Sequence, residues 1–311
     1  MSFADVEEAR LSYRHKIQKS WRIATIIIAI FLLLFILPHL IHQEFSLSLL
    51  LPIFILPFSG YVVATIIITF TTRKYAEDYR KTYKAYFVET SLARTFTNLK
   101  YNHNIGLDPA ILASTGMINL GDRYSSNDLV IANYKNVNFV QADAHIEEEH
   151  TDSDGDTTYV TIFRGRFMIL EFPKKFNFRL EVIGRKFCAY KNSNQNSKTN
   201  HKLTKIHTES IDFNKSFRIY AEDGFEAYYI LDPAFIEKIQ AIGENYKYRL
   251  IFGFVDNTLL VGLNDGQDSF EPPKYKKPLD EKTELAKVSL DIRVITDLID
   301  KLNLDKKLFQ N

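Results

Sequence analysis

The sequence predicts an α+β protein: an N-terminal hairpin of two transmembrane helices, followed by a cytosolic α+β domain with a mainly antiparallel sheet. Three observations predict it. Two long apolar stretches lie before residue 71. Short β-rich runs separated by turns follow after residue 120. Helical patterns flank these runs instead of alternating with them, which is typical of α+β rather than doubly wound α/β proteins.

The two apolar stretches cover about residues 23–41 and 46–70, and the second contains no charged residue. A helix needs roughly 20 residues to cross the hydrocarbon core of a bilayer, so both stretches are long enough. The connection between them is very short, which predicts an antiparallel hairpin over 23–70. No small-residue cleavage site follows the first stretch, which argues against a removed signal peptide.

Basic residues flank both stretches, whereas the connection has no Lys or Arg. The positive-inside rule therefore predicts a multi-pass protein of the bacterial inner (plasma) membrane, with residues 1–22 and both termini in the cytoplasm. Cations beside a membrane also attract anionic headgroups, although they can serve topology alone. The predicted lipid-headgroup contacts are Arg14, Lys16, Lys19, Arg22, Arg73 and Lys74.

Residues 71–311 are predicted to form the cytosolic α+β domain. The whole chain has 39 Lys and Arg against 38 Asp and Glu, a balance that argues against a nucleic-acid partner. A single cysteine, Cys188, excludes an internal disulfide and a Cys-rich zinc site. A low-complexity segment at about 191–201 predicts a mobile loop.

Four helices are predicted in this domain. Tyr75, Tyr79 and Tyr83 recur at helical spacing and predict a helix to about residue 100, with its aromatic stripe in the core or at the headgroups. Asp-Pro pairs at 108–109 and 232–233 predict helix starts, with ends at Gly116 or Gly121 and at Gly243. The last helix, about 280–304, has heptad-like apolar spacing, and either docks on the sheet or self-associates.

The predicted sheet is built from hairpins. Lys135-Asn136 and Asp256-Asn257 are the turns of two of them, and Gly165 suggests a bulge. Asp223 lies in a further turn and is expected to cap it. The predicted strands are 128–134, 137–147, 157–172, 177–183, 213–220, 225–231, 248–255 and 258–263.

One polar segment between two predicted strands offers a candidate metal site. Its carboxylates alternate along the chain, as in loops that bind calcium or another divalent cation, but the full EF-hand spacing is absent. On a strand, His145, Glu147 and Glu149 would share one face. The candidate ligands are His145, Glu147, Asp152, Asp154 and Asp156, and the alternative is a solvated hairpin tip without metal.

The sequence contains no recognisable catalytic or cofactor motif. A glycine-rich phosphate loop, a nucleophile elbow, a protein-kinase set and a His-Glu-x-x-His pair are all absent. No cofactor is therefore predicted apart from the cation above, and enzymatic activity stays an open alternative.

Several segments resemble an uncharacterised bacterial membrane family, known as domain of unknown function number three-one-three-seven. The motifs are Phe163-Arg-Gly-Arg-Phe167 with the strand before it, the run from Phe213 to Pro233, and Phe252-Gly-Phe254 with the strand after it. The resemblance covers about residues 75–270. It implies an N-terminal membrane hairpin and a cytosolic α+β region, and it implies no catalytic residue.

These observations together predict a membrane-anchored cytosolic interaction module at the inner face of a bacterial membrane. Its expected partners are membrane lipids and a protein, including other membrane proteins, and a homo-oligomer is compatible with the sequence. One alternative is an enzyme of unrecognised type acting at the membrane surface. Another is a pleckstrin-like lipid-sensing domain.

Overall fold

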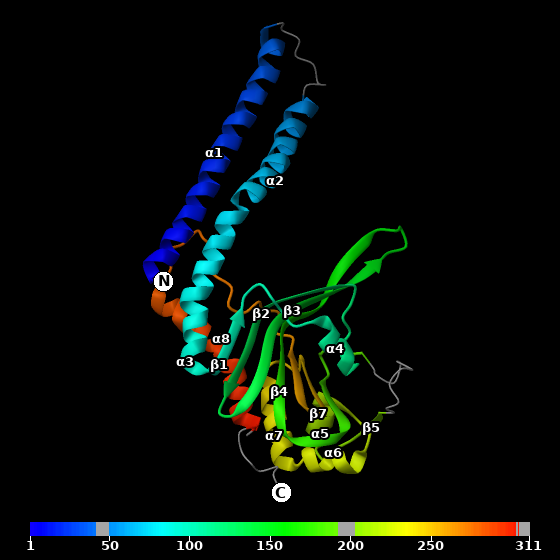
Figure 1. The fold of residues 1–311 in the computed structure, drawn as a ribbon. Helices are drawn as coiled ribbons and strands as arrows, with labels where there is room; N and C mark the ends of the chain where they lie inside the picture. Colours follow the sequence, from blue (N-terminus) through cyan, green and yellow to red (C-terminus); the bar gives the residue numbers. More distant parts are fainter. Residues whose placement is uncertain (42–49, 192–202, 303, 305–311) are drawn as a thin grey trace. The chain divides into compact units, whose positions relative to one another are not determined.

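The computed structural model describes residues 1–41, 50–191, 203–302 and 304 (Figure 1). The connection between the two apolar stretches, and nearly all of the predicted mobile loop at 191–201, lie outside the described residues. The chain divides into two compact units. Unit 1 comprises Met1–Val88 and Glu271–Glu284, and unit 2 comprises Glu89–Phe270 and Leu285–Asn311.

Unit 1 is built on two long helices, α1 (Phe3–Ile41) and α2 (Leu50–Tyr83). They run antiparallel, because Lys16 lies over the ring of Tyr75 while Trp21 packs on Tyr61, with ring centroids 5.3 Å apart. Gly60 allows close packing, since a Cβ there would lie 3.3 Å from the Ile28 side chain. The helical hairpin itself therefore forms.

The prediction that these helices span a membrane is contradicted. Within the part of the chain that the structure describes, no helix is both long and apolar enough to cross a bilayer. Charged residues run through α1 as far as Arg22 and through α2 from Arg73 onward, so each helix is apolar over only part of its length. The transmembrane spans at 23–41 and 46–70 and the multi-pass inner-membrane location, with its cytoplasmic termini, are therefore corrected.

The segment Glu271–Glu284 is held in unit 1 by polar contacts to both helices, and the contact with α1 is made by Arg10, which donates to the carbonyl of Tyr275 at 2.6 Å. Arg80 of α2 is half-exposed, and Lys84, the residue directly after α2, is buried. Each donates to Glu271 at 2.5 Å. The Tyr83 hydroxyl donates to Glu284 Oε2 at 2.7 Å. Burial alone would raise the pKa of Glu271, but the Lys84 and Arg80 cations together hold it below its usual range.

The aromatic stripe after Arg73 lies in the core, as one of the two alternatives predicted. Tyr79 and Tyr83 are buried in unit 1, and Phe87 packs against Tyr83 at 4.8 Å. The helix ends earlier than predicted. A π-helical turn, η2 (Lys84–Glu89), and a short helix, α3 (Thr90–Thr95), follow α2, and a strand that the pattern missed begins at Thr97.

Unit 2 is a seven-stranded sheet in which every pairing is antiparallel. The order is β1-β2-β3-β4-β6-β5, and β7 pairs with the other edge of β4 (Figure 1). The α+β class with a large antiparallel sheet is therefore observed. The strands are β1 (Thr97–Asn102), β2 (Arg123–Tyr134), β3 (Val137–Thr151), β4 (Thr157–Gly184), β5 (Thr204–Ile206), β6 (Phe217–Ala221) and β7 (Leu250–Leu263).

The predicted turn between β2 and β3 is confirmed. Lys135 and Asn136 both have positive φ, 47° and 67°, the pair of left-handed residues that a two-residue hairpin needs. The bulge lies elsewhere than predicted, because the register shift falls between Ile146 and Glu147, opposite Ile162. Gly165 is needed for close approach instead: a Cβ there would lie 2.0 Å from the carbonyl oxygen of Leu263.

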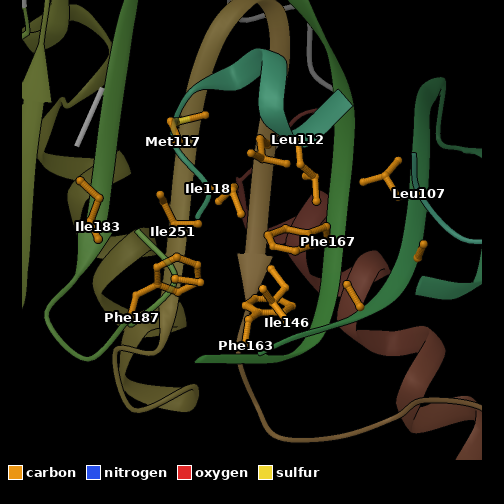
Figure 2. Packing of buried hydrophobic residues seen from close by; sticks show 14 residues of the cluster. Leu107, Leu112, Met117, Ile118, Ile146, Phe163, Phe167, Ile183, Phe187 and Ile251 are labelled. Carbon is orange, nitrogen blue, oxygen red and sulfur yellow. The ribbon is translucent and has the colours of Figure 1, made fainter. Parts of the chain in front are cut away.

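One face of this sheet carries an apolar core (Figure 2). Phe163 and Phe167 stack with ring centroids 4.2 Å apart, and Ile146 and Phe187 pack beside them. Helix α4 (Pro109–Thr115) and the residues after it cover this face through Leu112 and Met117. Apolar residues at alternate positions of β3 and β4 therefore close the core on one side of the sheet.

The Asp-Pro helix starts and the C-terminal helix are confirmed. Asp108 caps α4, which ends at Gly116 with φ 65°. Asp232 caps α7 (Pro233–Asn245), which continues two residues past the predicted end at Gly243. Helix α8 runs Glu281–Leu302, and its apolar positions Val288, Ile292, Ile295 and Ile299 are buried within the chain, as docking predicts.

Several strand predictions are wrong, in two ways: helices take the place of strands, and two predicted pairs are single strands. The start of the predicted strand 213–220 belongs to α5 (Ile211–Ser216), and the predicted strand 225–231 is α6 (Gly224–Ile230). The cap explains α6, because Asp223 accepts from the amides of Phe225 and Glu226. The pairs 157–172 with 177–183, and 248–255 with 258–263, are not separate strands but the single long strands β4 and β7.

Candidate functional site

The candidate metal ligands occupy two separate places on the β3–β4 hairpin. His145 and Glu147 lie side by side, with 3.8 Å between imidazole and carboxylate, and His145 also contacts the Thr161 hydroxyl at 2.9 Å. Asp152 lies seven residues further along the hairpin, about 20 Å away at roughly 3.3 Å per residue. The five residues therefore do not form one constellation.

At the tip itself the carboxylate of Asp152 already has partners. Asp152 Oδ1 accepts from the backbone amides of Asp154 at 3.0 Å and Asp156 at 2.9 Å, which closes the turn. Among the described residues the tip carboxylates do not form a group of three close ligand atoms. Calcium binding here stays a prediction, and it would require these side chains to rearrange.

The helices of unit 1 carry a large exposed apolar surface. The side chains of this surface are between 42% and 74% exposed, far more apolar area than single scattered residues provide. It comprises Ile23, Ile26, Ile27, Ile30 and Leu33 of α1, and Phe58, Tyr61, Val62, Val63, Ile66, Ile67 and Phe70 of α2. We refer to these residues as the apolar surface.

A groove of about 500 Å³ runs between α1 and α2 along this surface. Ile27 and Val63 line its middle, and Lys16 and Thr71 line one end. That volume lies in the range of sites that bind small molecules. Threonines beside the groove do not make it polar, because their hydroxyls donate to carbonyls of their own helix, as Thr65 does to Tyr61 at 2.8 Å.

The predicted headgroup cations gather toward one end of this groove. Lys16 lies in the groove lining, and Arg73 and Lys74 lie two and three residues after its last residue, Thr71. Lys19 and Arg22 are exposed on α1, and Arg14 and Lys16 are half-buried. Unit 1 therefore combines an apolar groove with a cationic end, and contact of these cations with lipid stays a prediction.

Unit 2 has a buried polar network on the sheet face opposite the core. Asp143 of β3 and Arg166 of β4 are register partners, and both are almost fully buried. Arg166 donates to the carbonyl of Asp291 at 2.7 Å and to the Ser269 hydroxyl at 2.5 Å. Asp143 accepts from the Ser269 amide. Burial raises the pKa of Asp143 to about 7, although the nearby Arg166 cation opposes the rise.

The sequence pattern gave Arg166 no role beyond the Phe163–Phe167 motif. An arginine and an aspartate within strands whose neighbours are mostly apolar are the signals that could have pointed to this network, since buried charges need partners. The two residues lie 23 positions apart in the chain, so only the pairing of β3 with β4 shows that they are neighbours.

Residues 161–304 match the family described as "Protein of unknown function (DUF3137)". The resemblance predicted from the motifs is thereby confirmed over this part, somewhat less than half of the chain, which runs from β4 through α8 and carries an uncharacterised domain. One solved structure is similar: "crystal structure of the mycobacterial trehalose monomycolate transport factor A, TtfA". The two chains are 11% identical and superpose with a TM-score of 0.34. The match covers 72% of this chain and 93% of that chain. No curated protein matches.

Proposed function

We propose that this chain is an interaction module that binds an anionic lipid through the apolar surface of α1 and α2. One observation carries the proposal: an exposed apolar groove between two helices ends at a cluster of cations. An anionic amphiphile has the matching shape, with an acyl chain for the groove and a headgroup for Lys16, Arg73 and Lys74.

Two energetic terms support this assignment. Apolar area removed from water is worth about 25 cal/mol per Å², so the exposed isoleucines and valines favour any apolar occupant. Each Lys or Arg beside anionic headgroups adds about 1 kcal/mol, which favours a negatively charged lipid over a neutral one. A protein segment would use the first term as well, but it would not need cations at the end of the groove.

The test is flotation of the full-length protein with vesicles of phosphatidylglycerol and, separately, of phosphatidylcholine. We expect the protein to float with the anionic vesicles and much less with the neutral ones, with the difference reduced at high salt. Equal flotation with both would contradict the role given to the cations. No flotation with either would contradict the proposal and leave a protein as the partner of this surface.

A matched pair of variants locates the contact. Val63→Asp with Ile67→Asp places two charges on the apolar surface, at residues that also line the groove. Val160→Asp with Ile211→Asp makes the same two changes at exposed positions of unit 2. The first variant should lose flotation while the second keeps it, and equal behaviour of the two would place the contact elsewhere.

A further inference from the structure

Unit 2 contains a second concave site, a cleft of about 520 Å³ that is separate from the α1–α2 groove. It lies between the chain after α7, the segment that follows β7, and α8. Arg166, Lys247, Arg249 and Lys287 are the cations that line it, and Asp265, Asp268 and Asp291 are the acids. Every lining residue lies within 161–304, the part of the chain that matches the family.

The acids of this cleft are engaged by the protein itself. Asp291 faces the Arg166 guanidinium at 3.5 Å and accepts from the amide of Phe270. Asp265 accepts from the amide of Gln267 at 3.0 Å, and Asp268 Oδ2 pairs with Arg164 at 3.7 Å. Asp268 Oδ1 is buried and has no hydrogen-bond partner among the described residues. Asp268 and Asp291 are therefore each paired with an arginine of the fold.

The cations at the rim are placed differently. Lys247 and Arg249 are exposed, and their side chains have no ion pair or hydrogen bond to other described residues. Arg166 lines the same cleft, and its Nε is buried and has no hydrogen-bond partner among the described residues. Among these three cations, Arg166 is paired with Asp291, whereas the charges of Lys247 and Arg249 have no ion-pair partner among the described residues.

The backbone that carries these cations is held in an unusual conformation. Lys247 and Tyr248 both have positive φ, 52° and 58°, which is costly for side chains other than glycine. Hydrogen bonds maintain it, since the Lys247 amide donates to Glu244 and the Tyr248 amide donates to Gly243 at 2.7 Å. Strain of this kind clusters at binding sites, where it fixes the direction of a side chain.

We propose that this cleft binds a small ligand through an oxyanion, a phosphate or a carboxylate, held by Lys247 and Arg249 in the cleft that Arg166 also lines. The exposed side chain of Leu290 gives the α8 wall an apolar patch, so the remainder of the ligand can be partly apolar. This site does not depend on the lipid proposed for unit 1.

The test is saturation-transfer NMR on the full-length protein with glycerol 3-phosphate as probe, with inorganic phosphate and acetate as competitors. The test variant is Lys247→Gln with Arg249→Gln, which keeps both side-chain stems. Its control is Lys100→Gln with Lys205→Gln, two exposed cations elsewhere in unit 2. Loss of two charge-assisted contacts should weaken binding at least about tenfold in the first variant and leave the control unchanged.

Absence of binding by the parent protein, or equal binding by the two variants, would overturn the proposal. Displacement of the probe by phosphatidylglycerol vesicles would assign the oxyanion to a lipid headgroup, and failure to displace it would assign it to a soluble molecule. Val63→Asp with Ile67→Asp should leave probe binding unchanged, so the two proposals fail independently.

Discussion

Units 1 and 2 place their apolar side chains in opposite ways. In unit 2, Phe163, Phe167 and Ile251 are fully buried beneath α4 and between strands. In unit 1, Phe58 and Phe70 of α2 are 72% and 74% exposed. Unit 2 therefore has a core of its own, whereas much of the apolar area of unit 1 has no partner within the described chain.

The two units also differ in how they use charge. Unit 2 buries Asp143 and Arg166 within its fold, where they hold α8 and the chain at Ser269 to the sheet. Unit 1 buries Lys84 against Glu271 but leaves Lys19, Arg22, Arg73 and Lys74 exposed beside an apolar groove. The difference is that unit 2 pairs its buried charges within the fold, whereas α1 and α2 leave cations and apolar side chains exposed together.

The largest expected effect breaks the core of unit 2. Phe167→Ala should destabilise it by about 3–5 kcal/mol, because the ring is fully buried and stacked on Phe163. Phe70→Ala, the same change on the apolar surface, should cost less than about 0.5 kcal/mol. Hydrogen exchange of amides in β3 and β4 measures the stability lost in Phe167→Ala. Similar losses of stability in Phe167→Ala and Phe70→Ala would contradict the contrast between the units.

The next effect is a pH dependence in unit 2. The pKa of Asp143 is about 7 in the folded protein against 3.8 ordinarily, so folding favours its protonated form. Its contribution to stability is complete below about pH 4 and is lost as the pH rises through 7. Asp143→Asn cannot titrate and should lose less stability than the parent between these limits, by up to a few kcal/mol.

Urea unfolding of both proteins at pH 4.5, 6 and 8 measures this difference, with Asp108→Asn as an exposed control. If the stabilities of the parent and of Asp143→Asn changed equally with pH, Asp143 would be shown to stay ionised.

A smaller effect concerns a helix cap in unit 2. Asp232→Ala should destabilise the protein by about 1 kcal/mol, because Asp232 accepts from the amide of Phe235 at 2.8 Å at the start of α7. Asp232→Asn keeps an acceptor and should lose much less. Thermal unfolding of the two variants tests the cap, and equal losses would show that the charge matters rather than the hydrogen bond.

The sequence was most informative where a short signal determines local structure. Asp-Pro pairs located two helices, and Lys135-Asn136 located a hairpin that the structure confirms. The sequence was least informative where pairing with a distant strand determines the local structure. Asp256-Asn257 resembles a turn, yet β7 continues through it because β4 pairs with it along most of its length.

The start of α6 carries a sequence signal for a helix. Asp223 with Glu226 fits the capping-box spacing, which predicts a helix, but the aromatic residues that follow favoured a strand. At the candidate sites, the spacing of His145, Glu147 and the tip aspartates suggested one cluster that the extended hairpin separates. The cleft cations come from distant segments, so no local pattern connects them.

The smallest expected effect is at the hairpin tip. Replacing Asp152, Asp154 and Asp156 with Asn should change stability by less than about 0.5 kcal/mol, because Asn keeps the oxygen that accepts from the turn amides. Asp152→Ala should cost more than Asp154→Ala, since it removes two hydrogen bonds. Calorimetry with calcium and with chelator checks for metal: a rise of several degrees that the triple variant abolishes would establish a cation site.

The α1–α2 surface is proposed to contact lipid, and one residue of α1 can report that contact directly. Trp21 is the single tryptophan of the sequence, and it packs on Tyr61 between the two helices. The direct measurement is its fluorescence with vesicles of phosphatidylglycerol that carry brominated acyl chains, against the same vesicles without bromine. We expect bromine to quench Trp21 strongly in the parent protein and weakly in Val63→Asp with Ile67→Asp. Unquenched emission from a parent protein that floats with these vesicles would contradict the account.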